Sequence, residues 1–348
     1  MTTENVTKAP KEWLYELSFM RPILLLLLVS YHAFAPWCGT WDMPAGCAPF
    51  EPYRWIALLS RAFRLECFVF ISGYIFTFQM LKKNKFSSFK ELLSSKMVRL
   101  LIPCWVFSII YFACFKHYTN VVDFLIVIVG GAGHLWYLPC LFICFIVQYL
   151  LIKRRYNTGI VLLILSLFTL ISVVPLPMKM DRPLYYMLFF YGGGLFYQNK
   201  DKIAMISTPK RVIISWIMFV VLLIGVNTIA EFSKGFDNQG VLKRGLIFGM
   251  NTGLKAILAW VGIYAFYMSA VIWCRKHTVS DWALNVGVCG YGVYVFHQFV
   301  LAWLYDHTSI SLVLGTYWLP WVAFVAATSI SLVLTLLIRK TKVGRKCL

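Results

Sequence analysis

Long apolar stretches recur along the whole chain, and they restrict its fold more than any other feature of the sequence. A helix that crosses a bilayer needs roughly 20 predominantly apolar residues. Hydrophobic residues make up 60% of the 348 positions and charged residues only 14%, far from the balance of a soluble domain. We predict an all-α polytopic membrane protein with about ten transmembrane helices, near residues 19–37, 55–80, 98–115, 133–152, 158–175, 183–198, 211–230, 250–273, 286–305 and 316–338.

Basic residues fall mainly on alternate loops between these stretches. If both termini are cytoplasmic, the Lys and Arg residues on inner segments outnumber those on outer loops by about three to one, as the positive-inside rule requires. The pattern therefore predicts that both termini are cytoplasmic. It also accounts for the net charge of +19 without a nucleic-acid partner.

We expect one integral-membrane domain over residues 1–348. The segments between predicted spans are too short for a fused soluble domain, and the N-terminal residues lack the pattern of a cleaved signal peptide. The two halves show no matching Gly- or Pro-broken segments, which are typical of many secondary transporters. We expect the glycines at 192–194 and within 287–292 to mark close helix packing.

The ten cysteines show no C-x-x-C pair and no metal-ligand spacing with histidine, so we predict no metal site. Most lie in predicted spans, where a thiol behaves as a small hydrophobe. Cys38 and Cys47 both fall in the first outer loop, and a disulfide between them is an open alternative to two free thiols.

Two titratable residues lie within the first predicted span. Arg21 and His32 are 11 residues apart, so a helix brings both to one face, about 16 Å apart along its axis. A titratable ring inside a membrane is a functional-site hypothesis by default. The alternative is structural: Arg21 extends to the inner headgroups, and His32 makes one hydrogen bond between helices.

Charged residues also enter the second span, in RAFRLECFVFISGYIF. Glu66 can orient an imidazole and raise its basicity, while Arg61 and Arg64 are candidate substrate ligands. An ion pair of purely structural value between Glu66 and either arginine is the alternative reading.

The loop before the third span carries six basic residues and ends with Lys96 and Arg99. These two are candidates for binding the phosphates of a nucleotide-bearing donor, against the simpler interpretation of a solvated inner loop. Trp136, Tyr294 and His297 lie in later spans, where an interfacial belt or helix packing is the alternative to substrate binding.

Several of these segments occur together in one known family. The Arg21-to-His32 spacing, ECFVFISGYIF, KMVRLLIP, HLWYLP and YGVYVFHQ occur in the order and on the spans where acyltransferase family 3 has its motifs. The chain thus resembles these bacterial integral-membrane O-acyltransferases over most of its length. It departs from the family pattern at Ser18, where an acidic residue is usual, at Pro22, where a small residue is common, and at Lys96, where arginine is usual and binds phosphate in a bidentate fork.

The resemblance implies transfer of an acyl group, acetyl or succinyl, from cytoplasmic acetyl-CoA or another acyl-CoA to a hydroxyl of a cell-surface or lipid-linked glycan. It implies location in the bacterial inner membrane, with His32 as general base or transient acyl carrier and Glu66 orienting it. Arg21, Lys96 and Arg99 would then bind the donor. A transporter or flippase of a lipid-linked saccharide is the principal alternative, and a pH-sensing membrane protein is a third.

Overall fold

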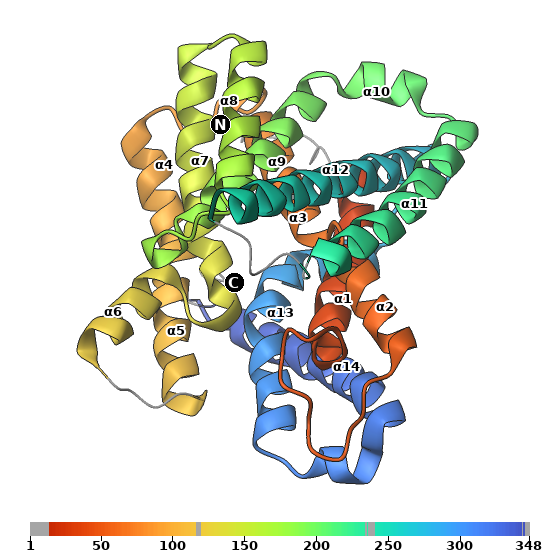
Figure 1. Ribbon diagram of the computed structural model, residues 1–348. Helices are drawn as coiled ribbons and strands as arrows, with labels where there is room; N and C mark the ends of the chain where they lie inside the picture. The colour runs from red at the N-terminus through yellow and green to blue at the C-terminus, as the bar shows by residue number, and fades with distance from the viewer. Residues whose placement is uncertain (1–13, 116–119, 234, 236–240, 343, 345–348) are drawn as a thin grey trace.

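The structure is a computed structural model that describes residues 14–115, 120–233, 235, 241–342 and 344. These residues form helices and no β-strand, so the predicted all-α class is confirmed for them (Figure 1). The α-helices in chain order are α1 (Tyr15–Ala33), α2 (Glu51–Arg61), α3 (Arg64–Leu81), α4 (Phe89–Lys96), α5 (Ile102–Phe115), α6 (Val121–Gly130), α7 (Tyr137–Arg154), α8 (Thr158–Ile171), α9 (Asp181–Gln198), α10 (Lys200–Ile206), α11 (Pro209–Ser233), α12 (Val241–Cys274), α13 (Asp281–Asp306) and α14 (Ile310–Arg339).

Seven helical segments among the described residues are long and apolar enough to cross a membrane. They are Tyr15–Ala33, Phe89–Phe115, Gly133–Arg154, Pro209–Ser233, Lys243–Cys274, Val286–Asp306 and Ile310–Arg339. Each coincides with one of the ten predicted spans, which confirms a multi-pass membrane protein. The count of ten and the orientation of the termini stay predictions.

The second predicted span, 55–80, is wrong as a single continuous helix. α2 ends at Arg61 and α3 begins at Arg64, because Phe63 leaves helical geometry with φ −149° and ψ −4°. The break lies where Arg61, Arg64 and Glu66 are concentrated, and non-helical backbone at membrane depth is tolerated where it lines a cavity or is buried in protein. The other two predicted spans without a long apolar helix are 158–175 and 183–198. They correspond to α8, an apolar helix of 14 residues, and to α9, which packs between α3 and α8.

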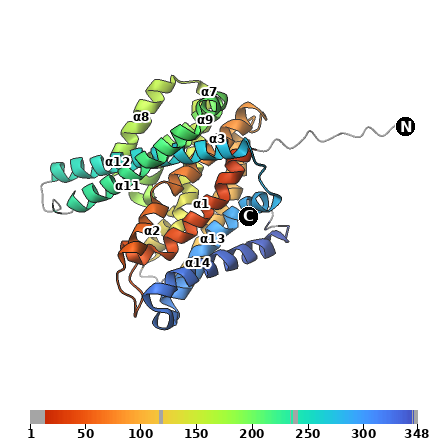
Figure 2. The ribbon, with the colours of Figure 1, turned by 90° about the vertical axis from the view of Figure 1, so that its right-hand side faces the viewer.

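α1 and α13 lie side by side and run in the same direction. Near their first turns, Arg21 of α1 lies against Gly287 of α13; toward the other end, the His32 and His297 rings are 5.0 Å apart between centroids. α14 packs on α13, while α11 and α12 form an antiparallel pair (Figure 2), in which α12 also packs against α1, α3 and α8. The parallel pair therefore has Arg21 near one end and the two histidines, His32 and His297, near the other.

Glycines allow α3 and α9 to approach closely, as predicted for 192–194. A Cβ atom on Gly193 would lie 2.0 Å from the Phe70 carbonyl oxygen, and one on Gly73 would lie 1.9 Å from the Phe190 carbonyl oxygen. The two backbones thus contact each other directly, and this contact fixes α3 and its charged N-terminal turn against α9. Of the second group, Gly292 lies tightly against Thr335, whereas Gly290 faces open space.

Candidate active site

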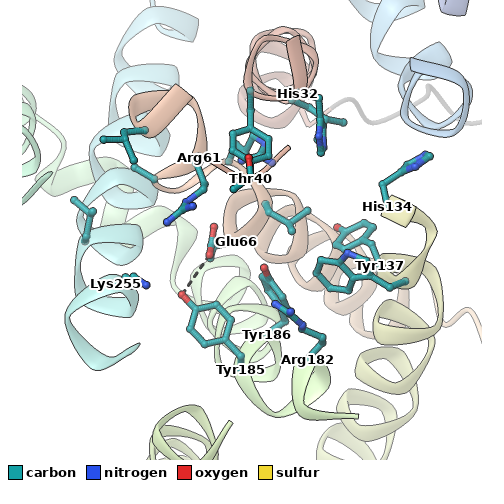
Figure 3. A pocket seen from close by; sticks show the side chains of 18 of the residues that line it. His32, Thr40, Arg61, Glu66, His134, Tyr137, Arg182, Tyr185, Tyr186 and Lys255 are labelled. Atoms are coloured by element: carbon teal, nitrogen blue, oxygen red, sulfur yellow. Dashed lines mark hydrogen bonds between the residues drawn. The ribbon is translucent and has the colours of Figure 1, made fainter. Parts of the chain in front are cut away.

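A cavity of about 720 Å³ lies between α1, α3, α9, α12 and α13, beside the break between α2 and α3. Figure 3 shows its polar side chains pointing inward from opposite sides: His32 and His134 from one side, Arg61 and Lys255 from the other, with Glu66 and Tyr185 between them. The predicted site residues on its wall are His32, Arg61, Arg64, Glu66, Trp136 and Tyr294. Sequence positions far apart in the chain therefore meet in one chamber.

Three histidine rings form a cluster at one side of this cavity. His297 lies between the other two, with ring centroids 5.0 Å from His32 and 5.1 Å from His134. His297 is fully buried and His134 is 6% exposed, so neither can exchange its ring hydrogen bonds freely with water. The three rings come from α1, from the 3-10 turn Gly133–Trp136 and from α13.

Backbone carbonyls fix the tautomers of two of these rings. His297 Nδ1 lies 3.0 Å from the Val293 carbonyl oxygen, and His134 Nε2 lies 3.0 Å from the Val295 carbonyl oxygen. A carbonyl only accepts, so each of these ring nitrogens carries the proton. In the neutral rings, His297 Nε2 and His134 Nδ1 then hold lone pairs, and both atoms are buried without a partner among the described residues, as is His32 Nδ1.

The residues of the 131–137 segment are held by contacts with several elements. Gly131 adopts a φ of +83°, and the Lys179 ammonium donates a hydrogen bond to its carbonyl oxygen at 3.0 Å. Tyr294 Oη donates to the His134 carbonyl oxygen at 2.6 Å. These contacts hold the segment at the cavity wall, which His134, Trp136 and Tyr294 line. Substrate binding by Trp136 and Tyr294 stays a prediction.

Arg64 is buried beneath the histidine cluster. Its guanidinium lies 3.9 Å from the centroid of the Tyr31 ring, and it makes a long hydrogen bond of 3.4 Å to the Ser60 carbonyl oxygen. The Tyr31 ring in turn contacts the His32 ring edge to face at 4.8 Å. A cation therefore lies one aromatic ring away from His32, and its Nε has no hydrogen-bond partner among the described residues.

Glu66 is paired with a tyrosine. Tyr185 Oη donates to Glu66 Oε1 at 3.3 Å, while the buried Oε2 has no partner in the described part of the chain. The imidazole ring beside His32 is that of His297. The proposal that Glu66 orients His32 stays a prediction, and in this structure the nearer candidate for that role is His297.

The three predicted donor ligands lie outside the cavity wall. Arg21 lies against Gly287, and the Arg99 carbonyl oxygen accepts a hydrogen bond from Tyr291, one turn further along α13. The Lys96 ammonium lies 3.5 Å from the centroid of the Phe145 ring, with the Phe76 and Phe86 rings at 5.6 and 5.3 Å. Arg21 and Arg99 thus lie along one face of α13, whereas Lys96 is turned into an aromatic cage.

Some lining residues were not among the predicted site residues. His134, Arg182, Tyr185 and Lys255 all contribute to the wall. The sequence alone could have indicated Lys255 as a site residue, because it is a charge within an apolar run of α12. Nothing in the sequence distinguished Tyr185, since a tyrosine near the start of a membrane helix is common.

The cysteine alternatives are also decided for the described residues. Cys38 and Cys47 are free thiols here, and Cys38 Sγ makes a hydrogen bond of 3.3 Å to the Ala35 carbonyl oxygen. No cluster of three or more His, Cys, Asp or Glu side chains in the described ranges is arranged to hold a metal ion.

Apolar helices around a polar chamber define a multi-pass membrane protein with an internal site. The family model described as an acyltransferase domain, that of acyltransferase family 3, matches residues 14–340, nearly the whole chain. The protein therefore belongs to acyltransferase family 3 and is a membrane acyltransferase. A search of the curated proteins and a search of the solved structures found no match.

Proposed function

We propose that this protein transfers an acetyl or succinyl group from cytoplasmic acyl-CoA to a hydroxyl of a cell-surface or lipid-linked glycan in the bacterial inner membrane. The observation that carries the proposal is the position of the His32 ring, on the wall of the cavity and 5.0 Å between centroids from the His297 ring, whose Nε2 is buried without a partner among the described residues. Family membership supports the reaction class, and the cavity supports an acceptor larger than water.

His32 acts as the general base in this proposal. Its Nε2 takes the proton from the acceptor hydroxyl, the hydroxyl oxygen attacks the thioester carbonyl, and the carbon–sulfur bond breaks. The proton then passes from His32 to the departing thiolate, which leaves as free CoA. A positioned general base contributes about 10²- to 10⁴-fold to such a step.

His297 holds His32 in the tautomer that this step requires. For Nε2 to accept a proton, Nδ1 must carry one, and the Nδ1–H needs an acceptor. The lone pair on His297 Nε2 is the buried acceptor beside it, since the Val293 carbonyl already fixes the proton on Nδ1 of His297. No hydrogen bond joins the two rings in this structure. In the proposal, a rotation of the His32 ring forms this bond, as catalytic hydrogen bonds often tighten only in the substrate complex.

The parallel α1–α13 pair supports a route for the donor. Arg21 and Arg99 lie near the start of these helices and can bind the phosphates of acyl-CoA, while His32 lies about 16 Å further along α1. The extended arm of CoA then follows the two helices and brings the thioester to the histidines. The donor enters at one end and the acceptor reaches the cavity at the other.

CoA release by the purified protein tests this function. The assay supplies acetyl-CoA or succinyl-CoA, with and without a crude lipid-linked glycan extract, and compares the wild type with His32→Ala. We expect extract-dependent release of free CoA that falls by about 10²-fold or more in the variant. His277→Ala is the matched control, because His277 is exposed and lies in the segment after the end of α12.

An alternative class, transport of a lipid-linked saccharide, predicts a different result. A transporter leaves its substrate unchanged in mass and releases no CoA under any of these conditions. Full CoA release by a folded His32→Ala protein would contradict the role assigned to His32 while leaving the reaction class intact.

A further inference from the structure

The side of the cavity opposite the histidines carries two cations that form no ion pair with a described carboxylate, with Glu66 as the carboxylate on the wall near them. Four cationic side chains line the cavity, namely Arg61, Arg64, Arg182 and Lys255, against two carboxylates, Glu66 and Asp181. Arg182 pairs with Asp181 at 3.3 Å, and Arg64 lies against the Tyr31 ring. Arg61 and Lys255 make no ion pair with any described residue.

Both side chains point into the chamber. Figure 3 shows the guanidinium of Arg61 and the ammonium of Lys255 directed into the cavity near Glu66 and Tyr185. They come from different elements, the last residue of α2 and the interior of α12. Lys255 lies within the segment Lys243–Cys274, which is apolar enough to cross a membrane. A cation at this depth is costly unless a partner or a polar cavity compensates it.

The break between α2 and α3 brings a further cation to the cavity wall, in the same helical turn as Glu66. Arg64 is 4% exposed, lines the cavity and has an Nε atom without a hydrogen-bond partner in the described part of the chain. It is also the first residue of α3, an 18-residue helix whose positive dipole end therefore faces the chamber. Asn227 and Thr252 line the same wall and offer neutral hydrogen-bonding groups.

We propose that Arg61 and Lys255 form an anion subsite that binds a phosphate or carboxylate carried by the hydroxyl acceptor. This inference rests on the proposed function and deepens it, because it makes the acceptor an acidic saccharide or a saccharide phosphate rather than a neutral sugar. The subsite faces the histidines across the cavity, so a bound acceptor holds its anion on the α12 side and its reacting hydroxyl on the α1 side. A thioester that arrives along α1 and α13 approaches from the histidine side.

Ligand binding tests the subsite without acyl transfer. Trp41 and Trp136 line the cavity, so tryptophan fluorescence of the purified protein in detergent reports occupancy. The probes are glucose 1-phosphate, glucuronate and neutral methyl glucoside, titrated through the millimolar range. We expect saturable binding of one or both anionic probes and at least about tenfold weaker binding of the neutral one. Whichever anion binds more tightly identifies the phosphate or the carboxylate as the source of the charge.

Charge-removing variants assign the effect to these two residues. Arg61→Gln and Lys255→Gln should each weaken binding of the anionic probe about tenfold or more, and Lys255→Arg should restore most of it. Lys276→Gln is the matched control, since Lys276 is exposed after the end of α12. The melting temperature of each variant identifies any that fail to fold, and the Lys255→Arg comparison keeps the test decisive for Lys255.

Three results would overturn the proposal. Neutral and anionic probes could bind equally or not at all, or the Gln variants could bind the anionic probe like the wild type. The third is a rise in KM for succinyl-CoA but not acetyl-CoA in these variants, with probe binding unchanged, because the pair would then bind the acyl group. Failure of the proposed function has a different signature: no CoA release, with selective binding of anionic sugars retained by the wild type and by His32→Ala.

Discussion

An imidazole that serves as a base needs a partner for its second nitrogen, and a carboxylate is the usual one. Here the nearest imidazole to His32 is that of His297, which the Val293 carbonyl holds as an acceptor at Nε2. A neutral partner avoids placing a further charge in a buried region that already contains Glu66 and Arg64. In the proposed mechanism His297 is a positioning residue, because its effect on the reaction passes through His32.

Substitution of His297 separates positioning from packing. We expect His297→Ala to lower kcat about tenfold to a hundredfold with little change in KM for acyl-CoA. The acidic limb of the pH–rate profile should also change position, because the titrating His32 ring loses the neighbour that it contacts. His297→Gln offers an amide oxygen as a substitute acceptor and should recover part of kcat. Equal losses in both variants with an unchanged pH profile would indicate a packing role only.

The donor ligands differ in their surroundings, so their substitutions should differ in effect. Arg21→Gln and Arg99→Gln should each raise the KM for acyl-CoA about tenfold, through loss of a charge-assisted phosphate contact. Lys96→Gln should chiefly lower the melting temperature, because it removes a cation held among Phe76, Phe86 and Phe145. Kinetics over a range of acetyl-CoA concentrations, with thermal unfolding of each variant, would distinguish the two. A Lys96 variant with normal stability and a raised KM would instead support donor binding by Lys96.

At the scale of elements, the contact between α3 and α9 depends on two glycines. Gly193→Ala should lower the free energy of unfolding by on the order of 2–3 kcal/mol, because its Cβ would lie 2.0 Å from the Phe70 carbonyl oxygen. The same variant should lower acyl transfer, since α3 carries Glu66 and Arg64. Thermal unfolding in detergent and the CoA release assay would measure both effects.

Gly225→Ala is the control for this prediction. Gly225 lies in α11, and a Cβ atom at this position would have no neighbouring atom within 4 Å among the described residues. The substitution should therefore be neutral or slightly stabilising through helix propensity. Equal melting temperatures for Gly193→Ala and Gly225→Ala would contradict the close α3–α9 contact.

The sequence predicts the elements well where hydrophobicity alone decides them. Seven of the predicted spans coincide with long apolar helices. A helix in a membrane must satisfy its backbone hydrogen bonds internally and present apolar side chains to the lipid. The break at Ala62–Phe63 was not predicted, since neither residue is a helix breaker and the flanking segments are apolar. At the break, Phe63 packs against Trp216 and Phe219 of α11 and Phe266 of α12, and a single sequence does not contain these contacts.

At the scale of the whole molecule, the site assembles residues from α1, α3, α9, α12 and α13. The polar residues inside spans, His32, Arg61, Arg64 and Glu66, could be predicted because burial makes each of them expensive. Their partners could not: Tyr185 pairs with Glu66 and His297 lies beside His32 only because distant helices meet. The sequence therefore indicates which polar residues line the cavity more reliably than which residues contact each other.

Thiol labelling of the loop between α1 and α2 tests the predicted orientation. A variant that retains only Cys47 should react with a membrane-impermeant maleimide on intact cells, because cytoplasmic termini place this loop outside. No reductant should be needed, since Cys47 is a free thiol. Burial raises the pKa of the Cys47 thiol, so labelling should be faster at alkaline pH, where the thiolate forms. Labelling only after the membrane is opened would reverse the orientation.

The two-residue break between α2 and α3 has a consequence for how substrate choice can change. Arg61 ends one helix and Arg64 begins the next, so an insertion, deletion or altered angle at this joint turns one relative to the other by about 100° per residue. His32 and His297 are on α1 and α13 and do not depend on the joint. Selection for a new acceptor can therefore act on a short hinge while the chemistry of acyl transfer is inherited unchanged.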